Sequence, residues 1–393
     1  MTGPLLISTV IVFFVLMLVL LLFLPYLTIL KQIAAFSYSN ARFHASGNPF
    51  VKKDVLKRLA ENTTLGELAS DLFSIGGYSV SLTSSTSPGD TASLAEFEKK
   101  VENETIRFLT SAVVSVPDEV RPFFRAFLLR MDARQIKTAL RSTWRGARPD
   151  ITHVFTVTPE IADRLRQCSS PEEVVEVLST TPFGQPLRES SEKYGSDRSM
   201  WEMAVDRTCF EHMNSSLNLV DDTLRPPIAK FFGHMVDVYD ILLCARVVGL
   251  GLPRGSLSGF FLEGGREIKE WRWKRMREAP DLRSMLQTIA DTSYSRAVSR
   301  AMAVLPPTTG KSEEPDREKI LVALKTLEKA LVTDLVSRAR EVSSTYSLFA
   351  GPAVAYVFLK EVEMRNLMAV ARGVVENRRF DEVEKELIVE GGV

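Results

Sequence analysis

The chain has 393 residues, which is long enough for two or three domains. Lysine plus arginine number 49 and aspartate plus glutamate also number 49, so the formal net charge is zero. This balance excludes a general nucleic-acid binder, which would carry a strongly basic patch or domain. The three cysteines and four histidines lack metal-ligand spacing, so we predict no metal site and interpret the cysteines as reduced core residues.

The N-terminus is the most strongly segregated part of the sequence. Residues 1–30 contain no charged side chain, and the stretch 5–30 is almost entirely apolar. About 20 successive apolar residues span a bilayer core, so we predict a transmembrane anchor over residues 1–30. A cleaved signal peptide is the alternative, but a basic n-region and a small-residue cleavage site are missing. Basic residues begin at Lys31, which predicts a single-pass cell-membrane protein with its N-terminus outside and its body on the cytoplasmic side.

The remaining sequence has helical periodicity. Apolar residues recur at three- and four-residue spacing and alternating strand patterns are scarce, so we predict an all-α body. Helical segments are expected at 106–115, 122–141, 228–249, 281–304, 317–341 and 352–375, and polar loops at 81–93, 145–153, 188–197 and 305–316.

One predicted loop contains the stretch Thr-Thr-Gly-Lys-Ser at 308–312. It is similar to the end of a phosphate-binding P-loop, but Leu305 replaces the first glycine and two prolines follow it. A proline has no backbone N–H to offer a phosphate, so we interpret the segment as a linker and predict no cofactor.

Three segments share an order of residues: an acid, a polar side chain three positions later and an arginine nine positions after the acid. An apolar residue followed five positions later by an aromatic residue precedes each of them, at Tyr78, Phe183 and Tyr294. Recurrence of this kind indicates an internal repeat, and we predict three related helical units over 31–166, 167–278 and 279–393. The repeat residues are Asp132, Gln135 and Arg141, then Asp237, Asp240 and Arg246, then Glu363, Asn366 and Arg372.

Helical geometry places each acid and its +3 polar residue within a core-facing stripe. A buried carboxylate is costly unless it is hydrogen-bonded or paired, and the arginine at +9 faces the opposite side of its own helix. We therefore expect the partner to be a helix N-terminus or a cation from another helix or unit. We favour a structural clasp over an acid pair for general acid–base catalysis, for which Asp237 and Asp240 are the best candidates. No catalytic residue is predicted.

A second candidate surface lies at residues 270–278, where aromatic and basic side chains are interleaved. We predict an interface or lipid-headgroup contact there, with the simpler interpretation being a solvated helix whose tryptophans pack on the body. The two tryptophans are two positions apart and so cannot share a helix face. The residues are Trp271, Arg272, Trp273, Lys274 and Arg275.

Six stretches of the sequence carry a resemblance to a known family. From about residue 36 to residue 390 the chain resembles the C subunit of archaeal and bacterial V/A-type rotary ATPases, the counterpart of the eukaryotic d subunit. The matching stretches are "FSYSNARFHA" (36–45, with Tyr38, Ala41 and Arg42), "LGELASDLFSIGGY" (65–78), "LLRMDARQIKTALR" (128–141), "VDVYDILLCAR" (236–246), "FLEGGREI" (261–268) and "YVFLKEVEMRNLMAVARG" (356–373).

The resemblance implies a non-catalytic rotor component of an ATP synthase or ATPase that transports ions or protons. Its fold would be a pseudo-threefold funnel of three helical domains. The funnel would sit on the ring of proteolipid subunits and receive the central stalk, so that torque passes through it. The predicted anchor departs from the family pattern, and we hypothesise that residues 5–30 enter the central pore of the ring.

Two other classes of function stay open. The chain could be a membrane-anchored helical scaffold or adaptor unrelated to rotary ATPases, which co-purification with proteolipid and nucleotide-binding subunits would test. An enzyme would need a pocket in which Asp237 and Asp240 reach solvent, and the core-facing stripe argues against that.

Overall fold

The computed structural model describes residues 3–46, 52–75, 78–80, 91–151, 158–252, 257, 259–305 and 317–389. Within these residues the regular elements are helices and no strand occurs, which confirms the predicted all-α class. The helices are α1 (Gly3–Ala45), α2 (Lys53–Ala60), α3 (Leu65–Ile75), α4 (Thr91–Ser115), α5 (Arg121–Trp144), α6 (Pro159–Gln167), α7 (Pro171–Val177), α8 (Gly184–Tyr194), α9 (Arg198–Asn218), α10 (Arg225–Gly249), α11 (Glu270–Glu278), α12 (Leu282–Gln287), α13 (Ser295–Val304), α14 (Arg317–Thr345), α15 (Gly351–Val375) and α16 (Phe380–Val383).

Three long helices that carry the repeated acids begin in the same way. Pro122 in α5, Pro226 in α10 and Pro352 in α15 each occupy the first turn. A proline there loses no hydrogen bond, because the first N–H groups of a helix have no partner within it, and its fixed φ already suits a helix. Each of the three helices also ends with an arginine in its last turn, where a cation complements the helix dipole.

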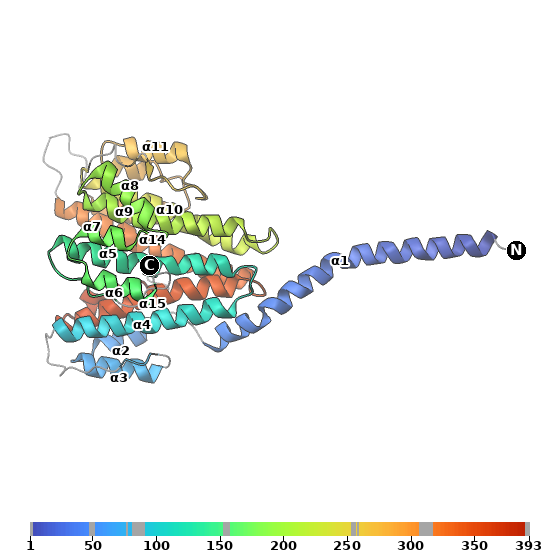
Figure 1. Ribbon diagram of the computed structural model, residues 1–393, viewed down its shortest axis with the longest axis horizontal. Helices are drawn as coiled ribbons and strands as arrows, with labels where there is room; N and C mark the ends of the chain where they lie inside the picture. Colours follow the sequence, from blue (N-terminus) through green and yellow to red (C-terminus); the bar gives the residue numbers. More distant parts are fainter. Residues whose placement is uncertain are drawn as a thin grey trace.

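Each of these three helices packs along another long helix. α5 lies against α9, α10 lies against α14, and α15 lies against α4. The ribbon in Figure 1 shows these long helices as a bundle of roughly parallel and antiparallel rods, with the short helix α11 at one edge and α2 and α3 at the other. Because α15 is near the C-terminus and α4 near the N-terminus, the two ends of the chain belong to the same part of the body.

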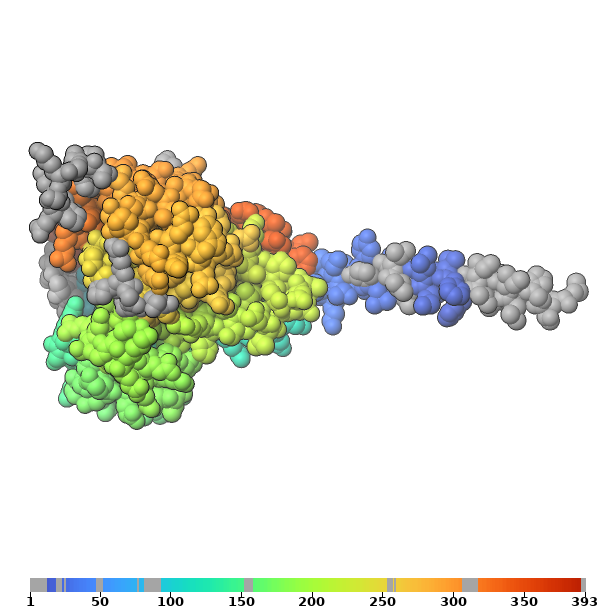
Figure 2. Space-filling view, turned by 90° about the horizontal axis from the view of Figure 1, so that it is seen from above, coloured from blue at the N-terminus to red at the C-terminus, as the bar shows by residue number. Residues whose placement is uncertain are grey.

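The short helices form the outer parts of the molecule. α7 and α8 pack on each other and on α5 and α9, and α11 to α13 pack on α10 and α14. Figure 2 shows these two groups as neighbouring regions of one face, green for the first and orange for the second. The core follows this arrangement: one large apolar cluster runs through most of the body, and a smaller one lies between α5 and α9 and the helices on them.

The predicted helices are present in the structure, with differences in extent. The segment 106–115 is the second half of the longer α4, and the segment 281–304 is two helices, α12 and α13, separated by a turn. The predicted loop 188–197 is wrong for its first part, because α8 continues through it to Tyr194, with Leu187 and Ser190 buried. Gly195, with φ of 58°, then ends that helix. Residues 81–90 and 306–316, including Thr-Thr-Gly-Lys-Ser, lie outside the described residues.

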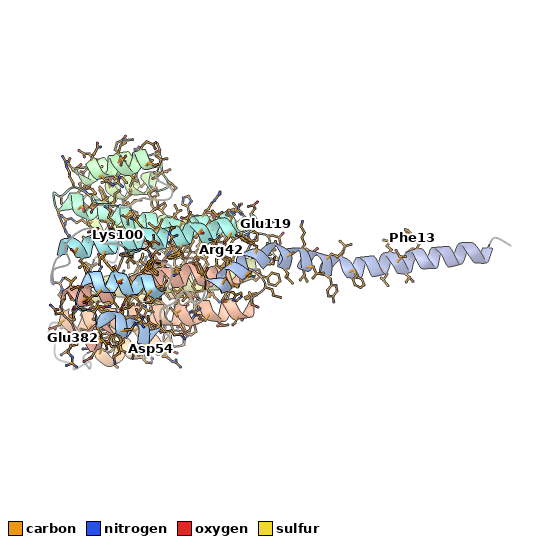
Figure 3. The ribbon with its side chains drawn as sticks, turned by 90° about the horizontal axis from the view of Figure 1, so that it is seen from below. Phe13, Arg42, Asp54, Lys100, Glu119 and Glu382 are labelled. Atoms are coloured by element: carbon orange, nitrogen blue, oxygen red, sulfur yellow. The ribbon has the colours of Figure 1, made fainter. Side chains whose placement is uncertain are left out.

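The first helix leaves the body and extends away from it (Figure 1). Its C-terminal part is fixed by the buried Phe36 and Phe43 and by Asn40, whose amide donates to the carbonyl oxygens of Ser347 and Phe349 at 3.0 and 3.1 Å. Farther out, apolar side chains such as Phe13 are exposed, as Figure 3 shows.

The predicted transmembrane anchor over residues 1–30 is wrong. Among the helices as far as the structure describes them, none combines the length and the apolar character that crossing a membrane requires. The predicted single-pass localisation, with residues 5–30 in the membrane or in the pore of a ring, depends on this anchor and is therefore wrong as well.

Candidate functional site

The acid of α10 has the most complete set of partners. Asp237 is fully buried, and its two carboxylate oxygens accept from the backbone N–H groups of Glu267 and Ile268, each at 2.9 Å. The hydroxyl of Tyr294 donates to the same carboxylate at 3.0 Å. Burial raises the pKa of Asp237, and the three hydrogen bonds oppose that shift because they stabilise the charged form. The acid thus ties α10 to the turn before α11 and to the start of α13.

A chain of hydrogen bonds continues from this acid to α14. A guanidinium nitrogen of Arg338 lies 2.9 Å from Nε2 of His234, and Nδ1 of His234 lies 2.9 Å from the hydroxyl oxygen of Tyr294. An arginine can only donate, so Nε2 accepts and Nδ1 carries the proton, which it donates to Tyr294. Burial, together with the charge of Arg338, lowers the pKa of His234 to about 3, so the imidazole is neutral at physiological pH. Every proton in the chain from Arg338 to Asp237 is therefore assigned.

The acid of α15 is held differently. Glu363 is buried, and one of its oxygens accepts from the hydroxyl of Tyr78 at 2.8 Å and from the ammonium of Lys360 at 2.5 Å. Lys360 is itself buried, and its ammonium lies 4.6 Å from the centre of the Phe108 ring. Burial raises the pKa of Glu363 and the charge of Lys360 opposes the shift.

The partners of both acids differ from the sequence-based expectation. A helix N-terminus or a cation from another helix was expected, whereas the structure supplies tyrosine hydroxyls, loop N–H groups and, for Glu363, a lysine of its own helix. Tyr78 and Tyr294 are two of the aromatic residues that marked the sequence repeat. Each one contacts the acid of a different segment of the chain, and Tyr78 is separated from Glu363 by 285 positions.

The polar residues at +3 are also buried, with varied partners. The amide of Asn366 both donates to and accepts from the backbone of Ile388, at 2.7 and 2.8 Å, and so attaches the C-terminal segment. Asp240 accepts from the N–H of Leu262 at 3.4 Å, and its other oxygen has no hydrogen-bond partner among the described residues. Burial, together with the neighbouring Asp237, raises the pKa of Asp240 well above its usual range. Asp132 and Gln135 of α5 are buried as well.

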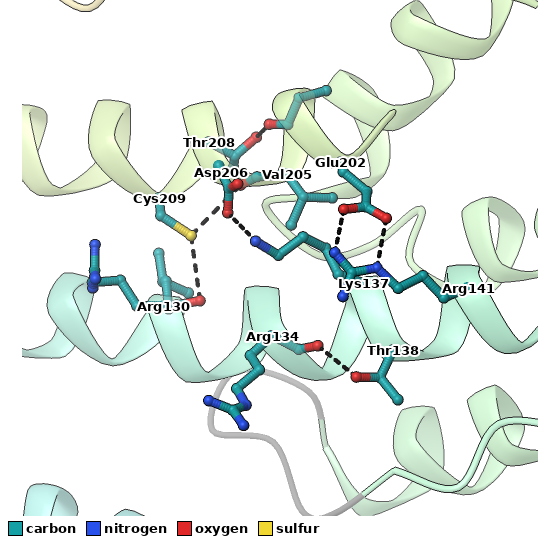
Figure 4. Close-up of polar contacts among 12 residues, drawn as sticks. Arg130, Arg134, Lys137, Thr138, Arg141, Glu202, Val205, Asp206, Thr208 and Cys209 are labelled. Carbon is teal, nitrogen blue, oxygen red and sulfur yellow. Dashed lines mark hydrogen bonds and ion pairs between the residues drawn. The ribbon is translucent and has the colours of Figure 1, made fainter. Parts of the chain in front are cut away.

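The three arginines at +9 face away from the acids and bridge to the paired long helix. Arg141 contacts Glu202 of α9 with Nε to Oε1 at 2.7 Å, as Figure 4 shows. Arg246 contacts Glu328 of α14 at 3.0 Å, and Arg372 contacts Glu98 of α4 at 2.7 Å. These arginine side chains are about half exposed, so the pairs orient the helices more than they stabilise the fold.

A cavity of about 530 Å³ lies where α5, α10 and α15 meet. Ion pairs line it: Arg130 with Glu361 at 2.8 Å, Lys137 with Asp206 at 2.6 Å and Arg365 with Glu328 at 3.0 Å. Figure 4 shows the pair between Lys137 and Asp206 across α5 and α9. Positive charge exceeds negative charge on its wall, with Arg130, Arg134, Lys137, Arg141, Arg246 and Arg365 against Asp206, Glu328 and Glu361.

The predicted contact surface on α11 divides between core and solvent. Trp271 is 54% exposed, whereas Trp273 is 2% exposed. Arg272 lies over the Trp271 ring at 4.6 Å and bonds to Asp291, so it is held by its own part of the molecule. Lys274 and the two tryptophans line an open groove of about 870 Å³ beside α9. A role for Trp271, Arg272, Trp273, Lys274 and Arg275 in binding stays a prediction.

Glycine at position 265 allows the turn to approach Asp237. A Cβ added there would lie 2.4 Å from Oδ1 of Asp237 and 3.0 Å from the carbonyl oxygen of Ile268. We expect Gly265→Ala to lower the free energy of unfolding by about 2–3 kcal/mol, because a buried methyl without space forces the backbone to move. Gly259→Ala is the matched control, since its Cβ would meet only an arginine nitrogen at 3.9 Å. Urea denaturation of both variants measures the difference, and equal stabilities would contradict the close approach.

Sequence reasoning missed several residues of these clasps. His234 and Arg338 lie in different helices, and no spacing in the sequence connects them. Lys360 could have been identified from the sequence as a partner of Glu363, because a cation three positions before a buried acid lies on the same helix face. The two aspartates considered for acid–base chemistry are both fully buried. Within the described residues, no group of three or more potential metal ligands occurs.

The fold and its clasps define an all-helical protein assembled from pairs of long helices. A family model described as "ATP synthase (C/AC39) subunit" matches residues 39–386, and the chain belongs to this family. It is a rotary ATPase subunit, which confirms the resemblance stated from the sequence and excludes a scaffold unrelated to rotary ATPases.

Individual relatives agree with the family assignment. The C subunit of the A-type ATP synthase from Methanothermobacter thermautotrophicus is 24% identical over 360 residues, covering 90% of this chain and 87% of that protein. The protein of the same name from Methanocaldococcus jannaschii is 24% identical, covering 69% of this chain and 66% of that protein, just under two thirds of its length. A third protein of this name, from Methanosphaera stadtmanae, is 21% identical, covering 87% of this chain and 85% of that protein.

Proposed function

We propose that this chain is a non-catalytic rotor subunit that links the central stalk of an A-type ATP synthase to its proteolipid ring and transmits torque. The observation that carries the proposal is the family match over residues 39–386, nearly the whole chain. In this role ATP is made or consumed elsewhere in the complex, and the chain supports ion or proton transport through its shape and rigidity.

The helix pairs support a body of three related units arranged as a funnel. α5 with α9, α10 with α14 and α15 with α4 each combine a buried acid on the first helix with an arginine that reaches a glutamate on the second. We retain three units as a proposal, with boundaries expected near 166 and 278. The packing of α15 on α4 favours grouping the two ends of the chain in one unit.

A torque-bearing part must resist opening, and the clasp at Glu363 serves that need. It joins α15 to Tyr78 near the other end of the chain, while Asn366 holds the segment that follows α16. These contacts join helices from distant parts of the sequence, so the first and last parts of the chain are packed together. We infer that load applied to one unit passes to the others through these closures.

The cavity between α5, α10 and α15 is the proposed contact with the central stalk. It is bordered by helices from all three proposed units and its wall is predominantly basic. Such a surface suits an acidic end of a stalk protein, since complementary charge guides association and fixes the orientation of partners. The exposed side of α11 with Trp271 remains a second proposed contact surface.

Co-purification with the other subunits tests this function. The full chain is mixed with tagged central-stalk subunits and, separately, with the purified proteolipid ring of the same complex. Arg365→Glu reverses a charge on the cavity wall beside Glu328 and is expected to weaken stalk binding about tenfold or more. Ring binding is expected to change little.

The matched control is Arg296→Glu on α13, because Arg296 is exposed and forms no polar contact with the described residues. It carries the same change in net charge outside the cavity, so stalk binding should be retained. If the unaltered chain binds neither the stalk nor the ring, the proposed rotor function is wrong. If Arg365→Glu and Arg296→Glu behave alike, the stalk does not contact this cavity.

A further inference from the structure

A second, smaller cavity lies where the first helix joins the body. The end of α1 contributes Arg42, Phe43 and Ser46 to it, α4 contributes Arg107, Phe108, Ser111 and Ala112, and α15 contributes Tyr356. Its volume is about 170 Å³, the space of about five or six water molecules. Figure 3 places Arg42 at the point where α1 meets the body.

The arginine of α1 lies at this cavity without a carboxylate partner among the described residues. Its guanidinium donates to the hydroxyl of Ser111, and among the described residues it contacts no carboxylate. The three repeat arginines, by contrast, each contact a glutamate of the neighbouring long helix. Arg42 is half-buried, so its charge is only partly compensated by water. A guanidinium carries five N–H donors, and Arg42 lines this cavity.

The rest of the wall also favours an anion. Arg107 of α4 contributes a second guanidinium, which bonds to Glu104 on its own helix. Hydroxyl groups of Ser46, Ser111 and Tyr356 border the cavity, and the Ser46 hydroxyl donates to the carbonyl oxygen of Arg42 at 2.9 Å. The guanidinium of Arg42, which contacts no carboxylate among the described residues, adds its positive charge to this wall.

The floor of the cavity is apolar. The rings of Phe43 and Tyr356 lie 4.9 Å apart, and Phe108 and Ala112 complete the surface. Hydrogen bonds and charge interactions strengthen against such a surface because fewer water molecules compete for them. The carbonyl end of α1 adds partial negative charge, about half an elementary charge, which the full positive charge of Arg42 outweighs.

We propose that this cavity binds a small tetrahedral oxyanion, either inorganic phosphate or the terminal phosphate of a phosphate monoester. The planar fork of an arginine matches two phosphate oxygens, and the hydroxyl of Ser111, which accepts from Arg42, has a proton to donate to another. The bound anion would bridge α1, α4 and α15. This assigns a role to Arg42, the arginine of the Tyr38, Ala41 and Arg42 pattern, in which Tyr38 itself is exposed.

Calorimetric titration of the full chain with potassium phosphate tests the proposal, with potassium chloride at equal ionic strength as the reference. We expect saturable phosphate binding and a rise in melting temperature, since a ligand that binds only the folded state stabilises it. Arg42→Gln is expected to weaken phosphate binding about tenfold or more, the loss associated with one charged hydrogen bond. Arg107→Gln is expected to weaken it less.

The matched control is Arg296→Gln, which removes one exposed positive charge on α13 and should bind phosphate like the unaltered chain. Arg42→Lys serves as a second variant, because it retains the charge and loses the fork; intermediate affinity is expected even if Arg42→Gln unfolds. Titration with glycerol 3-phosphate separates the two sources of the anion. If glycerol 3-phosphate binds more tightly than inorganic phosphate, the anion of this cavity is a phosphate monoester. If it binds more weakly, the anion is free phosphate.

Two results would overturn the proposal. The first is a response to phosphate no greater than the response to chloride at the same ionic strength. The second is equal phosphate affinity in Arg42→Lys, Arg296→Gln and the unaltered chain, which would show that the ion binds elsewhere or only by general charge.

Discussion

Asp237→Ala is expected to lower the free energy of unfolding by about 3–5 kcal/mol, the range for removing one partner of a buried charged group. The change leaves the N–H groups of Glu267 and Ile268 and the hydroxyl of Tyr294 without their acceptor. Each buried donor that loses its partner costs about 1–3 kcal/mol. Urea denaturation of the full chain, followed by circular dichroism at the helix band, measures the effect.

Asp237→Asn is a sharper variant of the same test. One oxygen of Asp237 accepts from Glu267 and Tyr294 while the other accepts from Ile268, so both must be acceptors. An asparagine has one acceptor and one donor at these positions, and in either orientation its NH₂ faces an N–H or O–H group. We expect a loss of about 2 kcal/mol or more despite the identical shape.

The control for both variants is Asp222→Ala. Asp222 pairs with Arg225, but its side chain is 87% exposed, so the loss is expected to stay within about 0.5 kcal/mol. A loss below about 1 kcal/mol for Asp237→Ala would mean that the turn before α11 reorganises around the missing acid. In that case the acid is not the element that holds α10 to α13.

The long helices could be predicted from the sequence because their buried faces impose a period. α10 and α15 match the predicted segments within three residues at each end, and the prolines that open them are visible in the sequence. α4 was predicted only over its second half, since its first half is rich in charged residues. The membrane anchor was predicted from the length and apolar composition of residues 1–30 and from the basic residues that follow them, and the described helices do not support it.

A break in a helix is harder to predict, since apolar periodicity continues across it. The predicted segment 281–304 divides at a turn in which the hydroxyl of Thr292 accepts from the N–H of Tyr294 and donates to the carbonyl of Ile289. This turn directs Tyr294 toward Asp237 on another helix. The reason for the break therefore lies in a tertiary contact, which the local sequence does not contain.

The same limit applies to the clasps. Spacing within one helix identified the acids and placed them on a core-facing stripe, because a helix fixes which residues share a face. It could not identify Tyr78 as the partner of Glu363, since that contact depends on how the two ends of the chain meet. The sequence repeat identified Tyr78 and Tyr294 only as aromatic residues. In the structure it is their hydroxyl groups that donate to the acids.

The acid on α15 leads to the second large expected effect. Glu363→Ala removes the acceptor of Tyr78 and leaves the buried ammonium of Lys360 without a carboxylate. We expect a loss of about 3–5 kcal/mol in the free energy of unfolding, because an unpaired buried charge is strongly destabilising. Assembly with the other subunits should fall in parallel. Glu119→Ala is the control, since Glu119 is exposed in the loop before α5 (Figure 3).

Glu363→Gln is expected to be milder, at roughly half that loss. Both contacts of Glu363 are made by the same oxygen, so a glutamine can place its carbonyl oxygen there and still accept from Tyr78 and Lys360. What is lost is the negative charge opposite Lys360. Asp237 has no such option, so the glutamine variant at 363 should be tolerated better than the asparagine variant at 237.

The double variant Lys360→Met with Glu363→Ala separates the two contributions. If the unpaired ammonium causes most of the loss, removing it should restore about 1–3 kcal/mol relative to Glu363→Ala alone. If the double variant is no more stable than Glu363→Ala, the lost bond to Tyr78 and the vacated space account for the effect. A Glu363→Ala protein that is stable and assembles normally, yet has lost a chemical activity, would contradict the structural role of this acid altogether.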